Sequence, residues 1–412
     1  MRPFRPRPGG TGATLDPVTA PGDAALAVVT ALCRAALAAE EGLPVEPVAL
    51  DGTDPRELFA TVQRHRVEEL LASYAGVLGL PDGLVRHLDA WRAAARQRTL
   101  LQALETVRAW ELLDRAGVGV LAFKGQPLAV QTTGRADARG PGDVDLLVAP
   151  DRLDVAHRVL TGAGWRLREG ARIEPGSWAW RHVGRWGNAL TYAGQGADVD
   201  LHWRLEITPD AHPPFEVLLG RAEQVALGVS SVATLSRYDA LRHLAAHREG
   251  WVWLRTLADL RRLCRDERIL ERPLRPAAVR SLAVARATVG LPAGVPAAVH
   301  AQLDRTAPRF LERVARQHAV AVPATFAGGA GGLIGVRHRL ASSSSVTDLQ
   351  HTAVALVLPA HAAYPIDART AWTGVPRALA RRAMTALRSL RRVVGRTIRR
   401  GGPCAGPPGR AA

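Results

Sequence analysis

Two acidic residues separated by a single position are the clearest candidates for chemistry in this chain. In the segment GDVDLLV, residues 142–148, Asp143 and Asp145 alternate with apolar residues. Side chains of a β-strand point alternately to its two faces, so both carboxylates are expected on one face and the apolar side chains in a core. Neighbouring carboxylates repel each other unless a cation lies between them, and Mg²⁺ prefers such oxygen ligands. The pattern predicts a metal site, and the alternative is a solvated strand end.

A second segment, VDLHW at residues 199–203, carries another carboxylate on a predicted strand. If the two strands are neighbours, Asp200 completes a cluster of three carboxylates; otherwise it solvates the edge of a sheet. Three carboxylates can hold two Mg²⁺ ions, and such a pair stabilises the attacking and leaving oxygens of a phosphoryl displacement. Asp200 is also a candidate general base. His202 follows on the same face, where a histidine more often orients a carboxylate than reacts itself.

Basic residues that suit a phosphate precede the acidic pair. Lys124 is the only lysine among the 54 basic residues, which favours a site where a compact ammonium is required. Gly125 follows it at the expected junction of a strand and a helix, where backbone N–H groups and the helix dipole attract phosphate. Arg139 stands four residues before Asp143 and is a candidate to hold the β- or γ-phosphate. The alternatives are a helix-capping turn for Lys124 and Gly125, and a solvated loop position for Arg139.

These segments together resemble a known family. The stretches FKGQPLA, RGPGDVDLLV and DVDLHW are similar to those of the uncharacterised nucleotidyltransferase family, which belongs to the polymerase-β-like nucleotidyltransferase superfamily. The similarity is close over residues 118–204. It continues more loosely through HLAAHREGWVWLRTLADLRRL, which includes Arg255 and Asp259.

The resemblance implies an enzyme that binds an NTP and a divalent metal. It implies that Asp143 and Asp145 bind the metal and that Asp200 is the third carboxylate. The residues that it places on the nucleotide side are Lys124, Gly125 and Arg139. The chain departs from the superfamily at Gln126, because the first glycine of the turn is usually followed by serine or glycine. The serine hydroxyl that often helps to hold the triphosphate is therefore missing.

Hydrophobic spacing predicts the elements that carry these residues. Helical spacing predicts helices at 24–39, 55–78, 84–116, 127–132, 151–163, 237–265 and 274–290. Short apolar runs predict strands at 119–123, 144–148, 165–168, 189–192 and 199–203. We therefore expect an α+β fold, in which a small mixed-sheet α/β domain is flanked by helical N- and C-terminal regions. The expected boundaries are a disordered N-terminus at 1–22, a helical region at 23–116, the nucleotidyltransferase α/β domain at 117–208, a helical domain at 209–365, and a basic amphipathic helix with a flexible tail at 366–412.

The positive charge of the chain is concentrated near its C-terminus. From Arg369 onward there are eleven arginines and no acidic residue, and removing these charges from the net +16 leaves +5. Residues 375–400 place apolar side chains on one helical stripe and most arginines on the other faces. Such a helix is expected to bind an anionic membrane surface or RNA, or else to pack its stripe on the protein.

The cysteines and the first residues bear on the compartment. The three cysteines are far apart and form neither a disulfide framework nor a metal-binding pattern. The first residues are charged and lack the apolar stretch of a secretory signal. We expect a cytoplasmic protein, with peripheral membrane association through residues 375–400 as a further expectation.

The sequence therefore predicts a Mg²⁺-dependent nucleotidyltransferase with two metal ions. It would transfer a nucleoside monophosphate from an NTP to an acceptor and release pyrophosphate. The modest charge of the body favours a small molecule, sugar or peptide as acceptor. The alternatives are an enzyme or toxin that modifies tRNA or other RNA, and a non-catalytic scaffold that keeps the fold and the acidic pair.

Overall fold

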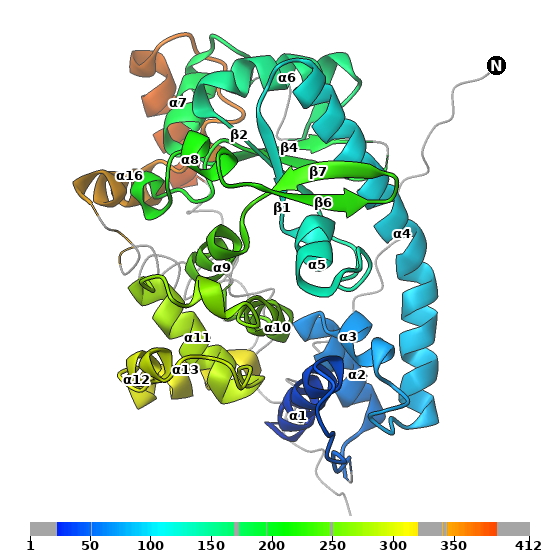
Figure 1. Ribbon diagram of the computed structural model, residues 1–412. Coiled ribbons are helices and arrows are strands. Elements are labelled where there is room, and N and C mark those ends of the chain that lie inside the picture. Colours follow the sequence, from blue (N-terminus) through cyan, green and yellow to red (C-terminus); the bar gives the residue numbers. More distant parts are fainter. Residues whose placement is uncertain are drawn as a thin grey trace, which may run out of the picture. The chain divides into compact units, whose positions relative to one another are not determined.

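The computed structural model shows two compact units (Figure 1). It describes residues 23–50, 52–168, 173–194, 196–247, 250–319, 340, 343 and 345–384. The first unit comprises the described residues of Met1–Val107, Ala122–Val144 and Gly220–Ser342. The second comprises those of Arg108–Leu121, Asp145–Leu219 and Ser343–Ala412. The two units interleave along the chain, and the consecutive domain boundaries expected from the sequence stay a prediction.

A five-stranded sheet carries the acidic residues. Its strand order is β1-β2-β5-β4-β3. The strands are β1 (Val120–Phe123), β2 (Val144–Val148), β3 (Arg166–Leu167), β4 (Ala189–Ala193) and β5 (Val199–His202). Strand β4 pairs antiparallel with both β3 and β5, and Thr191 is the register partner of Asp200. Strands β2 and β5 are therefore neighbours, which the convergence of their carboxylates requires.

The alternation of β2 and β5 explains why their carboxylates lie on the face opposite the apolar side chains of the core. In β2, Val144 and Leu146 are at most 1% exposed, whereas Asp145 between them is half-buried. In β5, Val199 and Leu201 are fully buried and Asp200 is again half-buried. Burial of the branched apolar side chains on one face fixes the register, because a slip by one residue would turn the carboxylates into the core.

Most of the first unit is helical. Its helices are α1 (Asp23–Glu40), α2 (Pro55–His65), α3 (Glu68–Ser73), most of α4 (Asp82–Arg115), α5 (Gly125–Thr133), α9 (Arg237–Ala246), α10 (Leu254–Leu263), α11 (Pro276–Thr288), α12 (Ala297–Leu303) and α13 (Pro308–Ala319). Helix α10 is central, since it packs against α1, α5, α9 and α11. Its buried Arg261 and Arg262 pair with Glu41 and Glu40 at the end of α1, at 2.8 and 2.7 Å. Paired in this way, the buried arginines join the two helices.

The second unit contains the larger part of the sheet. Its helices are the end of α4, α6 (Leu153–Gly162), α7 (Trp178–Trp186), α8 (Phe215–Leu219) and α16 (Val346–Val357). Ser177 caps α7 by accepting a hydrogen bond from the backbone N–H of Trp180. Trp178, Trp180 and Val183 of α7 are buried.

The α+β class expected from the sequence is confirmed, although some elements differ, and the helix expected at 237–265 is divided into α9 and α10. The segment after residue 209 was expected to be helical, but it also contains an antiparallel hairpin of β6 (Glu223–Leu227) and β7 (Ser230–Thr234). Each strand of the hairpin has only five residues, so the alternation of apolar and polar residues is short. Val225 and Val232 are register partners and are both buried. The helix expected at 55–78 is interrupted at Arg66, whose φ of 56° lies in the left-handed region and ends α2.

The C-terminal helical region is described only in part. Residues 371–384 are helical, while the remainder of the expected amphipathic helix, the flexible tail and residues 1–22 lie outside the described residues. Gly374 and Ala378 are the buried positions, and a Cβ at Gly374 would meet the ring of Trp178. Leu379 and Met384 are 39% and 50% exposed. No helix among the described residues is long and apolar enough to cross a membrane.

Candidate active site

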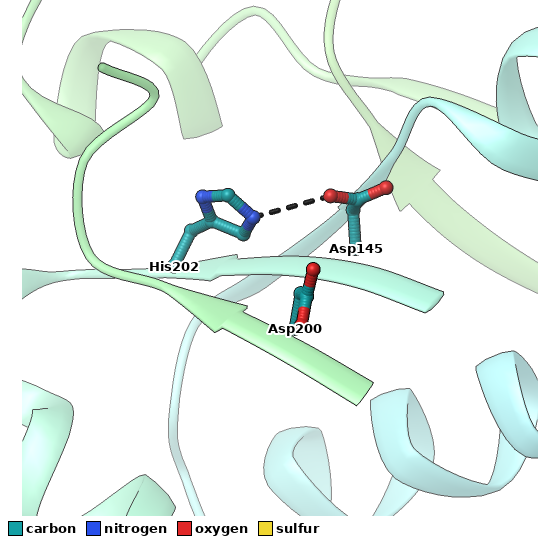
Figure 2. Close-up of side chains that lie close together, drawn as sticks. All are labelled: Asp145, Asp200 and His202. Atoms are coloured by element: carbon teal, nitrogen blue, oxygen red, sulfur yellow. Dashed lines mark hydrogen bonds and ion pairs between the residues drawn. The ribbon is translucent and has the colours of Figure 1, made fainter. Parts of the chain in front are cut away.

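The sheet of the second unit brings three potential metal ligands together. One ligand atom each of Asp145, Asp200 and His202 lies within 4.8 Å of the other two. Figure 2 shows Asp145 on β2 and the other two side chains on β5, with the imidazole directed at Asp145. Two residues of one strand and one of its neighbour thus form the cluster, as expected from the shared face of Asp200 and His202.

The histidine holds one of the carboxylates in place. His202 Nε2 lies 3.1 Å from Asp145 Oδ1, and the two side chains are 7% and 11% exposed. An ionised carboxylate can only accept, so the hydrogen bond has Nε2–H donating to Asp145. A bond of this kind fixes the orientation of a carboxylate that binds metal.

Strand β4 supports the other carboxylate. The hydroxyl of Thr191 donates to Asp200 Oδ1 at 2.7 Å, across the register pair of β4 and β5. Asp198, which directly precedes β5, forms an ion pair with Arg168 at 2.8 Å. The Asp200 carboxylate therefore has a fixed orientation within the cluster. Sequence reasoning missed Thr191, because its role follows from the strand register alone.

Asp143 is not among the three clustered residues. It comes directly before β2 and is exposed. The side chain of Gln102 fixes its backbone: Gln102 Nε2 donates to Asp143 O, and Gln102 Oε1 accepts from Gly142 N, both at 2.7 Å. Gln102 is 1% exposed and lies on α4, about forty residues away, so no local pattern predicts this contact.

The turn between β1 and α5 has an unusual backbone. Lys124 adopts φ 57° and ψ −149°, a region that residues other than glycine rarely enter. Gly125 follows with φ 38°, and a Cβ there would lie 3.4 Å from Asp143 O. The Lys124 ammonium lies 5.2 Å from the ring centroid of Phe123. Strain of this kind at a residue that also carries a charge is typical of functional positions.

Arg139 is tied into the first unit by a buried ion pair. Its Nε donates to Asp259 Oδ2 at 2.8 Å, and the two side chains are 8% and 0% exposed. Its Nη1 reaches the carbonyl of Gly125 at 3.5 Å. Arg255 in turn donates to the carbonyl of Arg139, also at 3.5 Å. Arg139 therefore contacts the turn that contains Gly125, and the expected solvated loop alternative does not describe it.

The surroundings of Arg139 carry an excess of buried positive charge. Burial, together with the charges of Arg139 and Arg66, lowers the pKa of Arg255 to about 9. Burial also raises the pKa of the neighbouring carboxyl of Glu68 to about 7, which weakens the negative charge available there. Burial thus disfavours the charged form of both side chains, and the charges of Arg139 and Arg66 add to the effect at Arg255.

Comparison with known proteins decides the family. A model of the family described as "Uncharacterised nucleotidyltransferase" matches residues 51–289. The chain belongs to this family. No curated protein matches the chain.

The match to the nucleotidyltransferase family covers the residues of the candidate site. The matched range includes the Lys124–Gly125 turn, the strands of the five-stranded sheet and the ion pair of Arg139 with Asp259. It ends before α12, α13, α16 and the basic tail. The chain is thus a nucleotidyltransferase with a cluster of side chains able to hold a metal ion, and the segments before residue 51 and beyond residue 289 lie outside the matched range.

One residue of the nucleotidyltransferase turn stands out by its burial. Gln126, where the wider superfamily has serine or glycine, is 1% exposed. Neither its amide nitrogen nor its amide oxygen has a hydrogen-bond partner among the described residues. A buried amide without partners costs about 1–3 kcal/mol. Gln126 therefore replaces the usual small residue with a polar side chain that packing alone does not favour.

Proposed function

We propose that this nucleotidyltransferase transfers a nucleoside monophosphate from an NTP to an acceptor hydroxyl, with Mg²⁺ as cofactor and pyrophosphate as leaving group. The observation that carries the proposal is the convergence of Asp145 and Asp200 on one face of neighbouring strands. Carboxylates kept this close, in a cluster with a histidine, are more stable with a cation between them.

The donor set fits Mg²⁺. We propose Asp143, Asp145 and Asp200 as the metal ligands, with two ions expected. Carboxylate oxygens are the ligands that this ion prefers, and His202 serves by orienting Asp145. When bound, the ions would supply electrostatic stabilisation of the phosphate charge. Asp143 lies outside the cluster of Asp145, Asp200 and His202 and is exposed directly before β2.

Asp200 is proposed as the proton acceptor. The hydroxyl of the acceptor loses its proton as its oxygen bonds to the α-phosphorus. Thr191 donates to one oxygen of Asp200 and so fixes the direction of its carboxylate. A base held in one direction contributes typically a factor of about 10²–10⁴ to such a reaction.

The triphosphate is proposed to bind at the turn between β1 and α5. The N–H groups at the start of α5, the Lys124 ammonium and the helix dipole all favour an anion there. We propose that Arg139 acts on the nucleotide mainly through the carbonyl of Gly125, since its guanidinium is already paired with Asp259. Arg255 adds a further positive charge beside Arg139, because its guanidinium donates to the Arg139 carbonyl.

A small acceptor is favoured over RNA. Without the eleven arginines of the tail, the net charge of the chain is only +5, which is low for a protein that must bind a nucleic-acid phosphate backbone. We propose that residues 375–400 bind an anionic membrane surface or RNA without taking part in the chemistry.

Direct binding measurements test the proposal. Calorimetry should show Mg²⁺ binding by the wild type that is strongly reduced in Asp145→Asn and in Asp200→Asn, and NTP binding that depends on the metal. Asp198→Asn is a matched control, because Asp198 directly precedes the same strand but is paired with Arg168. NTP binding of equal strength without metal, or metal binding unaffected by both variants, would refute the proposed site.

A further inference from the structure

The second unit contains a cavity that the proposed reaction has not used. Its volume is about 130 Å³, and it lies between the end of β2, the segment that follows β5, and α8. Leu147 of β2 and Leu218 of α8 form part of its lining, together with Trp203 and Glu206. Every residue that lines it belongs to the second unit, as do Asp145, Asp200 and His202.

Residues that follow the metal cluster along the chain line the cavity. Leu147 is two residues past Asp145 on β2, so the two side chains point to the same face and their Cα atoms are about 6.6 Å apart. Trp203 and Glu206 follow His202 along the chain after β5. Both strands that carry the cluster therefore run into the cavity at their carboxyl ends.

The volume limits what can bind. An apolar cavity of roughly 150 Å³ holds one benzene ring, so 130 Å³ accommodates a single five- or six-membered ring. Pockets for larger organic ligands have volumes of about 300–1,000 Å³. A complete nucleoside triphosphate or an RNA helix does not fit, which leaves one ring of a small molecule.

The lining identifies the kind of ring. Apolar walls come from Leu147, Trp203, Phe215 and Leu218, all at most 8% exposed. Polar groups come from Glu206, Thr208 and His212 of the intervening segment. A hydroxylated ring matches such a lining, because its C–H faces pack on aromatic and aliphatic side chains while its hydroxyls reach polar groups at the edge.

One wall of the cavity is rigid. Arg204 lines it, and Arg204 Nη1 donates to the carbonyls of Gly184 and Gly187 at 2.9 and 3.1 Å. The indole N–H of Trp203 donates to the same Gly184 carbonyl at 2.9 Å. A pocket built on fixed side chains requires little ordering when a ligand enters.

From these observations we infer that the cavity binds the acceptor of the reaction through a hydroxylated ring of monosaccharide size. This inference rests on the proposed function and names its acceptor class. A hydroxyl of the bound ring attacks the α-phosphorus of the NTP and forms the new O–P bond. The bond between the α-phosphorus and the bridging oxygen breaks, pyrophosphate leaves with the electron pair, and the proton passes to Asp200.

Ligand-observed NMR on the full chain tests the inference without requiring turnover. The probes are D-glucose, D-ribose, myo-inositol and phenol, with adenine as a nucleobase control, each at millimolar concentration. Leu218→Phe and Leu218→Trp fill the cavity in two steps. Val217→Trp is the matched control, because Val217 lies on the same helix but is 47% exposed and does not line the cavity. Circular dichroism verifies that each variant is folded.

The expected result is saturation transfer to at least one hydroxylated ring in the wild type and in Val217→Trp. In a folded cavity-filling variant, the saturation-transfer signal should fall at least tenfold. Glu206→Gln should weaken the same signal, since it changes a polar group of the lining without filling the space. Binding of adenine alone would make the cavity a base pocket and overturn the inference. Binding of no ring, or binding unaffected by the Leu218 variants, would overturn it as well. Failure of the proposed function would appear separately, as a lack of metal-dependent NTP binding.

Discussion

Removal of the His202 imidazole should weaken metal binding by an amount that the structure allows to be worked out. His202 Nε2 donates to Asp145 Oδ1 at 3.1 Å, and the pair is almost completely shielded from water. A hydrogen bond to a charged group contributes about 1.5–3 kcal/mol. At about 1.4 kcal/mol per factor of ten, its loss corresponds to roughly 10- to 100-fold weaker binding of Mg²⁺. The same range is typical of residues that orient metal-binding side chains.

The assay compares His202→Ala with His202→Gln by calorimetric titration with Mg²⁺, and with Mn²⁺ by electron paramagnetic resonance. Glutamine retains an N–H at a reach similar to that of Nε2, so His202→Gln should recover most of the affinity. At saturating metal, kcat of His202→Ala should return close to the wild-type value, because the histidine positions Asp145 and does not react.

A buried histidine elsewhere in the second unit supplies the control. His182 is 8% exposed and bonds the Leu358 carbonyl at 3.1 Å, away from the acidic residues of the sheet. His182→Ala removes a similar volume and should leave metal affinity unchanged. The reasoning is refuted if His202→Ala binds metal like the wild type, or if His182→Ala weakens binding equally. A kcat that stays low at saturating metal would instead make His202 a participant in the chemistry.

Three further predictions concern the turn, the charged network and the tail. Lys124→Gly should relieve a backbone strain of about 1–3 kcal/mol and raise the midpoint of thermal unfolding, while weakening NTP binding; a variant that loses stability would argue against strain at this residue. The pKa of Glu68 is raised to about 7 in the folded protein, so the stability it contributes is present below its ordinary value near 4.5 and is lost as the pH rises through 7. Denaturation at pH 5 and pH 8 should therefore show the wild type losing on the order of 3 kcal/mol relative to Glu68→Gln, and parallel curves would contradict the buried, neutral carboxyl. Truncation after Met384 should preserve nucleotidyl transfer to a small acceptor but abolish binding to anionic vesicles or RNA in co-sedimentation and filter assays at low salt, and unchanged binding would place the attachment elsewhere.

The strands of the site could be predicted closely from the sequence. The alternation of apolar and acidic residues located β2 at Val144–Val148, and the same argument placed Asp200 and His202 on one face of β5. Period-two alternation is a local property, so it can be recognised without knowledge of the rest of the fold. That argument assumed that β2 and β5 are neighbours, and the strand order of the sheet shows that they are.

Contacts between distant segments could not be predicted. Helix α4 was expected from apolar residues at helical spacing, but Leu101 and Leu104 of that stripe are 38% and 58% exposed, while Gln102 and Thr106 are buried. The periodicity of a helix shows that it forms; which face is buried depends on what packs against it. The pairing of Arg139 with Asp259 joins residues 120 positions apart and has no local signal.

The measurement that tests the central claim most directly follows two labels in one reaction. The purified full-length chain is incubated with Mg²⁺, an extract of small metabolites, and an NTP labelled either at the α- or at the γ-phosphorus, beside the Asp145→Asn variant. Nucleotidyl transfer predicts that the α-label moves to an acceptor while the γ-label leaves in pyrophosphate, and that neither change occurs in Asp145→Asn. Movement of the γ-label to the acceptor would make the enzyme a phosphotransferase, and equal transfer by Asp145→Asn would contradict the role of the carboxylate cluster.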